Sequence, residues 1–240
     1  MNNHKFLLSA IFLFVFISAL VLPVFAVSYN PGVTTGQFIK YGYFSGNGQG
    51  FEAFNDYGFL QLQVTSISGK QVTLLSTGQF KNGTALPGNG TTAVWNIEKG
   101  AEDGTPSTQG PIIATNLNQG DPIPPPDTYS VNQSESRMYL GSIRAVNILN
   151  VEISTSDYNS TLSYVYDKLS GMLLESSTQT TIQSEPQQVT SSYSYSIIET
   201  NIFSSTPTPS VPEFPILILG IVVVVLLVSI TALILVARRK

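Results

Sequence analysis

Alternation of apolar and polar residues is the feature that most constrains what this chain can fold into. In the segments 60–65 and 71–74, leucine and valine alternate with glutamine and threonine, and a Ser-Gly turn lies between them at 68–69. Because successive side chains of a β-strand point to opposite faces, a period of two indicates strands with one buried face. No stretch of a dozen residues between 27 and 203 sustains the 3.6-residue period of a helix.

The same period returns in the second half of the chain. Apolar residues of the segment 162–166 share one face, and a Gly-containing turn at 167–171 leads back into 172–175, which predicts a second hairpin. In the segment 193–197, tyrosine and isoleucine alternate with serine, as expected of a last strand. We therefore predict an all-β, mostly antiparallel domain of about eight to ten strands, either a curved sheet of the half-barrel kind or a sandwich.

Three regions between the predicted strands are rich in Asn, Gly, Thr and Pro, and we expect them to be loops. They are 81–90, 98–110 and 121–127. The domain is expected to span 27–203, and a domain of that length can bury roughly 70% of the surface that its unfolded chain exposes. It therefore needs no disulfide bonds to fold, in keeping with the absence of cysteine.

The N-terminal segment 1–26 has the layout of a secretory signal peptide. Lys5 precedes an apolar run, and Val24 and Ala26 supply the small residues that signal peptidase requires, so cleavage is expected after Ala26. The alternative is an uncleaved signal anchor. Under either interpretation, an N-terminal signal helix precedes the β domain, and the domain is exported.

The segment 216–237 is an uninterrupted apolar run in which the only hydroxyl residues are a serine and a threonine. As a helix it would be about 33 Å long, enough to cross a hydrocarbon core of about 30 Å. The alternative, a buried core helix, would normally show a polar stripe, and this run has none. The basic tail 238–240, Arg238-Arg239-Lys240, is expected to stay in the cytoplasm, which places the N-terminal domain outside the cell as part of a single-pass membrane protein.

The segment 204–215 is rich in Ser, Thr and Pro, and we interpret it as an extended stalk. Its end reads Pro212-Glu213-Phe214, directly before the apolar run and the basic tail. This order resembles the PEF-type C-terminal sorting signal of archaeal surface proteins. The resemblance implies processing by an archaeosortase-like membrane enzyme that removes the tail, whereas a plain membrane anchor is the alternative.

The residue inventory excludes several kinds of chemistry. The only histidine, His4, lies in the predicted signal peptide, and there is no cysteine, so Ser-His-Asp and Cys-His catalysis and imidazole or thiolate zinc sites are excluded from the mature domain. The only local groupings of carboxylates are Glu102-Asp103 and the pair Asp121 and Asp127. We interpret them as solvated loop charges and expect no catalytic residue, cofactor or metal site.

The charge balance argues against nucleic acid as a partner. The segment 27–215 carries seven Lys and Arg residues against all fifteen carboxylates, a net charge of −8, and its basic residues are scattered singly. A phosphate backbone is usually bound by a basic stripe, and none is present in this acidic segment. Its polarity comes instead from Ser, Thr, Asn, Gln and Gly.

Four sequons mark candidate acceptors of N-linked glycans, at Asn82, Asn89, Asn132 and Asn159, each in or beside a predicted turn. The tract 164–175 is similar to a hairpin of uncharacterised archaeal exported proteins and of lipoprotein-carrier-like half-barrels. We expect a non-catalytic, membrane-anchored cell-surface protein whose β domain engages an envelope protein, a glycan or a small ligand. The alternatives are an extracellular hydrolase that uses two carboxylates and a carrier of hydrophobic ligands, which would need an apolar groove or patch.

Overall fold

The computed structural model describes the central part of the chain. The chain divides into two units, Met1–Phe203 and Ser204–Lys240, and all described residues except Ser204 belong to the first. Among the described residues, no helix is both long and apolar enough to cross a membrane. The predicted signal peptide, membrane span and basic tail lie outside these residues, as does the stalk from 205 onward. The described ranges are 29–48, 50–102, 105–106, 110–124, 129–184 and 187–204.

The described chain is all-β, and its only helical parts are two short 3₁₀ turns, η1 (Glu52–Asp56) and η2 (Ile202–Ser204). The strands are β1 (Phe38–Asn47), β2 (Tyr57–Ser68), β3 (Gln71–Phe80), β4 (Thr91–Asn96), β5 (Ala101–Glu102), β6 (Thr105–Pro106), β7 (Pro122–Ile123), β8 (Tyr129–Ser130), β9 (Gln133–Tyr139), β10 (Ser142–Ser154), β11 (Tyr158–Asp167), β12 (Leu173–Ser184) and β13 (Gln187–Thr200).

Eleven of these strands form one antiparallel sheet in the order β6-β5-β4-β3-β2-β1-β13-β12-β11-β10-β9, and β7 pairs with β8 in a small second sheet. The all-β, antiparallel prediction is confirmed. The described residues hold thirteen strands rather than eight to ten, because β5, β6 and β7 fall in regions predicted as loops. Each of the three is two residues long, too short to show an alternating pattern in the sequence.

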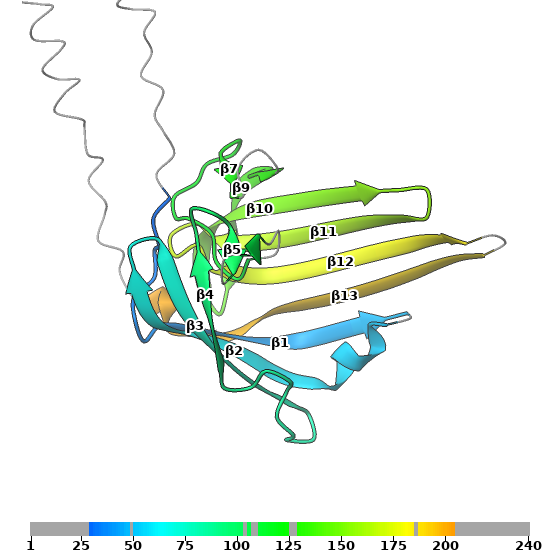
Figure 1. The fold of residues 1–240 in the computed structure, drawn as a ribbon, viewed down its shortest axis with the longest axis horizontal. Helices are drawn as coiled ribbons and strands as arrows, with labels where there is room; N and C mark the ends of the chain where they lie inside the picture. Colours follow the sequence, from blue (N-terminus) through cyan, green and yellow to red (C-terminus); the bar gives the residue numbers. More distant parts are fainter. Residues whose placement is uncertain are drawn as a thin grey trace, which may run out of the picture. The chain divides into compact units, whose positions relative to one another are not determined.

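The predicted hairpins are present. β2 and β3 pair around the turn at Gly69, and β11 and β12 pair around the turn that ends at Gly171. β13 lies between β12 and β1, so the last strand of the domain joins its N-terminal and C-terminal halves. Figure 1 shows β10 to β13 running side by side as long strands, with β2, β3 and β4 crossing them at a steep angle.

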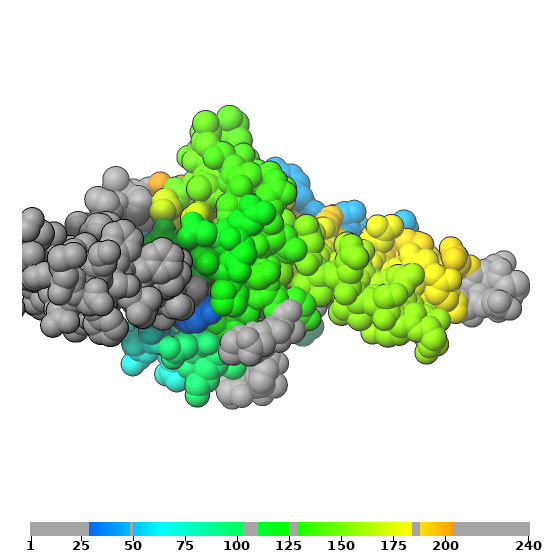
Figure 2. Space-filling view, turned by 90° about the horizontal axis from the view of Figure 1, so that it is seen from above, coloured from blue at the N-terminus to red at the C-terminus, as the bar shows by residue number. Residues whose placement is uncertain are grey.

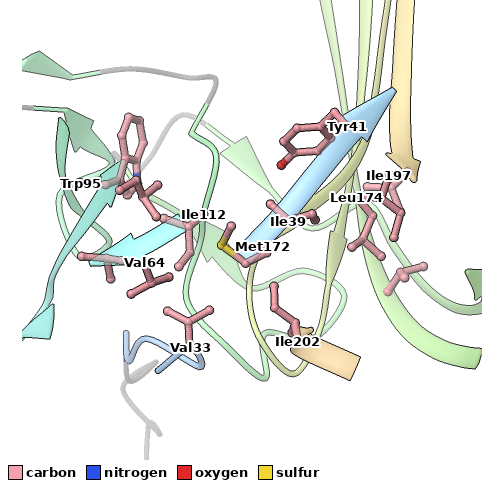
Figure 3. Packing of buried hydrophobic residues seen from close by; sticks show 14 of the residues in the cluster. Val33, Ile39, Tyr41, Val64, Trp95, Ile112, Met172, Leu174, Ile197 and Ile202 are labelled. Carbon is pink, nitrogen blue, oxygen red and sulfur yellow. The ribbon is translucent and has the colours of Figure 1, made fainter. Parts of the chain in front are cut away.

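The main core cluster includes residues from strands near both edges of the sheet. Trp95 on β4 and Tyr139 on β9 belong to the same cluster, together with residues of β1, β2 and β12. The sheet therefore wraps around this core. Figure 3 shows how Val33, Met172 and Ile202 lie together with Ile39 and Ile112.

A second cluster covers one face of β10, β11 and β12. The segment 110–124 supplies Ile113 and Leu117, which belong to the same cluster as Leu149, Tyr164 and Tyr166 of these strands. At the start of the segment, the Tyr166 hydroxyl donates a hydrogen bond of 3.0 Å to the carbonyl of Gly110. This segment therefore buries that face over the turn end of the strands.

The distal parts of β10 to β13 extend beyond this packed region (Figures 1 and 2). In Figure 2 they form the yellow-green and yellow projection beyond the green body. Side chains there include the exposed Ile153, Tyr158, Ile182 and Val189. The two faces of this extension differ in composition, and the candidate site lies on one of them.

Candidate functional site

A row of four serines crosses four neighbouring strands on one face of the extension. Ser163 on β11 is the register partner of Ser177 on β12, Ser177 is the partner of Ser194 on β13, and Ser194 is the partner of Ser45 on β1. We call these four residues the serine row and the face that carries them the polar face. Because neighbouring strands lie about 4.8 Å apart, the row repeats a hydroxyl group at that interval.

The hydroxyls of the serine row are available to a ligand. Ser45 and Ser177 are exposed, and Ser163 and Ser194 are half-buried. Among the described residues, none of the four side chains has a hydrogen-bond partner. Each hydroxyl can donate one hydrogen bond and accept two, so the row is a regular array of unused donors and acceptors.

An arginine bridges two carboxylates on the same face. The Arg137 guanidinium on β9 donates through Nε to Glu135 and through Nη1 to Glu175 of β12 at 3.2 Å. All three side chains are about one third exposed, so the group remains in contact with solvent. Burial and the nearby Glu175 carboxylate raise the pKa of Tyr139, which keeps its phenol protonated. The group presents donors and acceptors fixed by charge-assisted hydrogen bonds.

Tyr43 projects from an irregularity in β1. The pairing of β1 with β13 shifts register between Gly42 and Ser45, and Tyr43 has a left-handed backbone with φ of 49°. A bulky residue with positive φ is strained, and bulges often re-aim a side chain beside a functional site. The ring is 77% exposed. The register shift therefore places an exposed aromatic ring next to the serine row.

Most of these features line one open groove of about 440 Å³, although Ser45 and Glu135 are not among its lining residues. It combines serine hydroxyls, one arginine, one carboxylate and the Tyr43 ring. The lining residues are Tyr43, Arg137, Ser163, Val165, Glu175, Ser176, Ser177, Ser194, Tyr195 and Ser196.

The opposite face of the same strands carries aromatic rings in contact, which we call the aromatic cluster. Phe54 stacks on Tyr193 with ring centroids 4.9 Å apart and on Tyr57 at 5.1 Å. A Cβ atom at Gly46 would lie 1.7 Å from the carbonyl oxygen of Phe51, so glycine lets the turn before η1 lie against β1. The members are Tyr41, Phe44, Phe51, Phe54, Tyr57, Phe80, Tyr193 and Tyr195.

The aromatic face continues into an apolar patch at the distal ends of the strands. Tyr158 is the register partner of Ile182, and Ile182 is the partner of Val189. Together with Ile153 on β10, these side chains are between 37% and 42% exposed. The periodicity in the sequence identified parts of β11, β12 and β13 nearer the turn at 167–171, and it indicated neither these distal ends nor their uncovered apolar residues.

All four sequon asparagines are exposed. Their Oδ1 atoms accept hydrogen bonds: from Thr84 N to Asn82, from Gly78 N to Asn89, from Asn150 N to Asn132 and from Ser154 Oγ to Asn159. None of the four Nδ2 atoms, which would carry the glycan, has a hydrogen-bond partner among the described residues. Asn159 lies in β11 one residue after its start, and the other three lie in turns or between strands.

The structure brings together carboxylates that the sequence keeps apart. Glu135 and Glu175 share one guanidinium although forty residues separate them, and neither belongs to a local acidic grouping. Of the groupings seen in the sequence, Asp121 accepts a hydrogen bond from Asn118 N at 2.7 Å, and Asp103 and Asp127 lie outside the described residues. The described part of the chain holds no group of three acidic or histidine side chains placed to bind a metal.

Some predicted residues cannot be placed. The sorting-signal residues Pro212, Glu213 and Phe214 and the basic tail Arg238-Arg239-Lys240 lie outside the described residues. Conversely, no local pattern in the sequence indicated Tyr43 or the serine row, because serines spread over four strands meet only through register. Trp95, the only tryptophan, is buried in the core. A scan against models of protein families and a search among curated proteins each found no match for the chain.

Proposed function

We propose that this chain is a non-catalytic, membrane-anchored cell-surface protein whose extracellular β domain binds an extended glycan along the serine row. The observation that carries this proposal is the strained, exposed Tyr43 beside a row of unpaired hydroxyls. An aromatic ring can cover the apolar C–H face of a sugar, while serine, arginine and glutamate satisfy its hydroxyls.

The spacing of the row supports an extended polymer rather than a single small molecule. The interval of about 4.8 Å between strands is close to the rise of one pyranose unit in an extended polysaccharide. The groove is open and polar, and its carboxylates are already paired with Arg137. A hydrolase with two carboxylates would instead place them across a deep cleft, with one free to act as the acid.

Binding of full-length protein to immobilised neutral polysaccharides, such as a β-glucan, a mannan and a galactan, tests the proposal. Ser177→Trp fills the row and Tyr43→Asp removes the ring, so each should weaken binding at least about tenfold. Ser68→Trp is the matched control, because Ser68 is an exposed serine at the end of β2 that does not line the groove. Equal binding by all three variants would contradict a glycan site on this face.

The aromatic face favours a second candidate, carriage of a hydrophobic ligand. The eleven-stranded sheet, which wraps around its core, supports a half-barrel rather than a sandwich, and a half-barrel is the architecture that the carrier-like hairpin of 164–175 implied. The exposed apolar patch at Tyr158 and Ile182 lies on the same face as the aromatic cluster. Monomeric proteins seldom leave such patches uncovered without a functional reason.

A long-chain alkyl lipid with a fluorescent label distinguishes the two candidates. If the aromatic face carries lipid, Ile182→Lys should weaken lipid binding by about tenfold or more, because it places a charge in the apolar patch. Ile143→Lys is the control, since Ile143 is also exposed but lies on the hairpin between β9 and β10. If lipid does not bind, or binds equally to both variants, the carrier function is wrong.

The anchor and its processing belong to the same proposal. The support is the order of stalk, Pro212-Glu213-Phe214, apolar run and basic tail in the sequence. Mass spectrometry of the mature protein gives the test. A C-terminus at Lys240 would contradict removal by an archaeosortase-like enzyme and leave a plain membrane anchor, whereas an N-terminus at Met1 would contradict signal-peptide cleavage after Ala26.

A further inference from the structure

Strand β9 forms one edge of the large sheet, and no described residue pairs with its outer side. The strand at the other edge, β6, is two residues long, whereas β9 has seven residues. Ser136 in the middle of β9 is exposed, and Met138 is 71% exposed. An edge strand of this length carries unpaired N–H and C=O groups that can pair with another strand.

The turn after β9 determines which backbone groups point outward. Leu140 and Gly141 join Tyr139 to Ser142, and both have positive φ, 48° and 80°, as in a two-residue type I′ hairpin. Tyr139 and Ser142 therefore form the hydrogen-bonded pair next to the turn, and alternate residues of β9 follow the same pattern. The residues whose N–H and C=O groups point to the open edge are Ser134, Ser136 and Met138.

The sequence of β9 is complementary to itself when two copies run antiparallel around Ser136. In that register Ser136 faces its own counterpart, and Ser134 faces Met138 in both directions, so every outward N–H meets an outward C=O. Glu135 then lies directly opposite Arg137 of the second copy, twice. Opposite charges on directly facing residues stabilise an antiparallel pair, whereas like charges destabilise it.

We propose that β9 pairs with β9 of a second copy of this chain, antiparallel and with Ser136 on the two-fold axis. The contact is isologous and closed, so it produces a dimer and no further growth. It consists of six backbone hydrogen bonds and two Glu135–Arg137 pairs. Each guanidinium has five N–H donors, and the bonds to Glu135 and Glu175 within its own chain use two of them, which leaves donors for the second copy.

Cross-linking of the full-length chain in membranes tests the register. The protein has no cysteine, so Ser136→Cys introduces a single thiol on the two-fold axis, where the two Cα atoms of a hydrogen-bonded pair lie about 5.5 Å apart, within disulfide range. Mild oxidation should give a covalent dimer on a non-reducing gel. Ser68→Cys, at an exposed serine of β2, controls for random collision. If Ser136→Cys forms no more dimer than Ser68→Cys, the pairing is wrong.

A charge at the axis gives an independent measurement. Ser136→Lys places two ammonium groups opposite each other without altering the inner hydrogen bonds of β9. It should raise the dimer dissociation constant of the full-length chain in detergent by more than about tenfold, measured by sedimentation velocity. Ser68→Lys should leave the constant unchanged. A monomeric wild-type chain, or equal dissociation constants for the wild type and the Ser136→Lys variant, would overturn the proposal.

Discussion

At the residue scale, one buried ion pair fixes the turn between β11 and β12. Asp167 is fully buried and accepts hydrogen bonds from Arg144 Nε at 2.8 Å and Nη2 at 3.0 Å. The same carboxylate accepts from the Ser170 amide at 2.8 Å and hydroxyl at 2.7 Å. The Arg144 guanidinium also lies over the Phe203 ring at 4.5 Å. The four hydrogen bonds all end on one carboxylate.

Asp167→Ala should therefore lower the free energy of unfolding by about 3–5 kcal/mol, because it leaves a buried guanidinium without its counter-ion. Glu199→Ala is the matched control. Glu199 pairs with Lys40 at 3.1 Å on the surface, and its loss should cost less than about 1 kcal/mol. Urea unfolding followed by circular dichroism measures both variants. Similar losses of unfolding free energy in the two variants would show that the buried ion pair stabilises the fold no more than the surface pair does.

Tyr43 links strain to binding at the same scale. Aspartate tolerates a left-handed backbone better than tyrosine, so Tyr43→Asp should raise the free energy of unfolding by about 1 kcal/mol while it weakens glycan binding. Leu140→Asp provides the comparison, since Leu140 has a φ of 48° and the change creates the Asp-Gly pair that type I′ turns favour. It should stabilise the protein to a similar extent and leave glycan binding unchanged. A loss of stability in Tyr43→Asp would contradict stored strain.

At the element scale, the segment 110–124 depends on a close approach at its first residue. A Cβ atom at Gly110 would lie 2.3 Å from Cζ2 of Trp95, and Trp95 is too deeply buried to move aside. Gly110→Ala should thus cost about 1–3 kcal/mol through overpacking. Gln119→Ala, at an exposed position of the same segment, should change stability by less than about 0.5 kcal/mol. Thermal unfolding of both variants tests whether this segment contributes to global stability; equal melting temperatures would contradict it.

At the scale of the whole molecule, buried phenols predict loss of stability in alkali. Burial is the main cause that raises the pKa of Tyr41, Tyr164, Tyr166 and Tyr195 in the folded protein. An unfolded tyrosine releases its proton near pH 10, so the folded state binds more protons above that pH. The contribution of these tyrosines to the free energy of unfolding is therefore fully present below about pH 10. Above that pH it falls, by up to about 1.4 kcal/mol per pH unit for each such tyrosine.

Melting temperatures measured across the alkaline range test whether stability falls as the pH rises. Tyrosinate absorbance should appear for these groups only when the β-sheet signal in circular dichroism is lost. A melting temperature that stays constant to about pH 12 would contradict it.

Dimerisation through β9 would also change how the whole molecule presents its site. A two-fold axis perpendicular to the sheet keeps both polar faces on the same side, so two serine rows would flank the β9 seam. An extended glycan that contacts both rows would gain avidity without any new contact. The Ser136→Lys variant should then bind a long polysaccharide more weakly than the wild type but a short oligosaccharide equally well.

The sequence by itself determined the fold class and the strands that carry the period of two. Alternation at 60–65 and 162–166 requires only local geometry, since side-chain direction along a strand depends on the strand alone. For the same reason it identified the hairpins and placed the sequons in or beside turns. It missed β5, β6 and β7 because a two-residue strand has no measurable period.

Only the tertiary structure decided the site. The serine row depends on the register of four strands, and Glu135 and Glu175 meet because Arg137 joins two strands that are not neighbours in the sheet. The exposure of Tyr43 follows from a register shift against β13. Register and bulges result from how distant strands pack, so no local pattern of residues could have specified them.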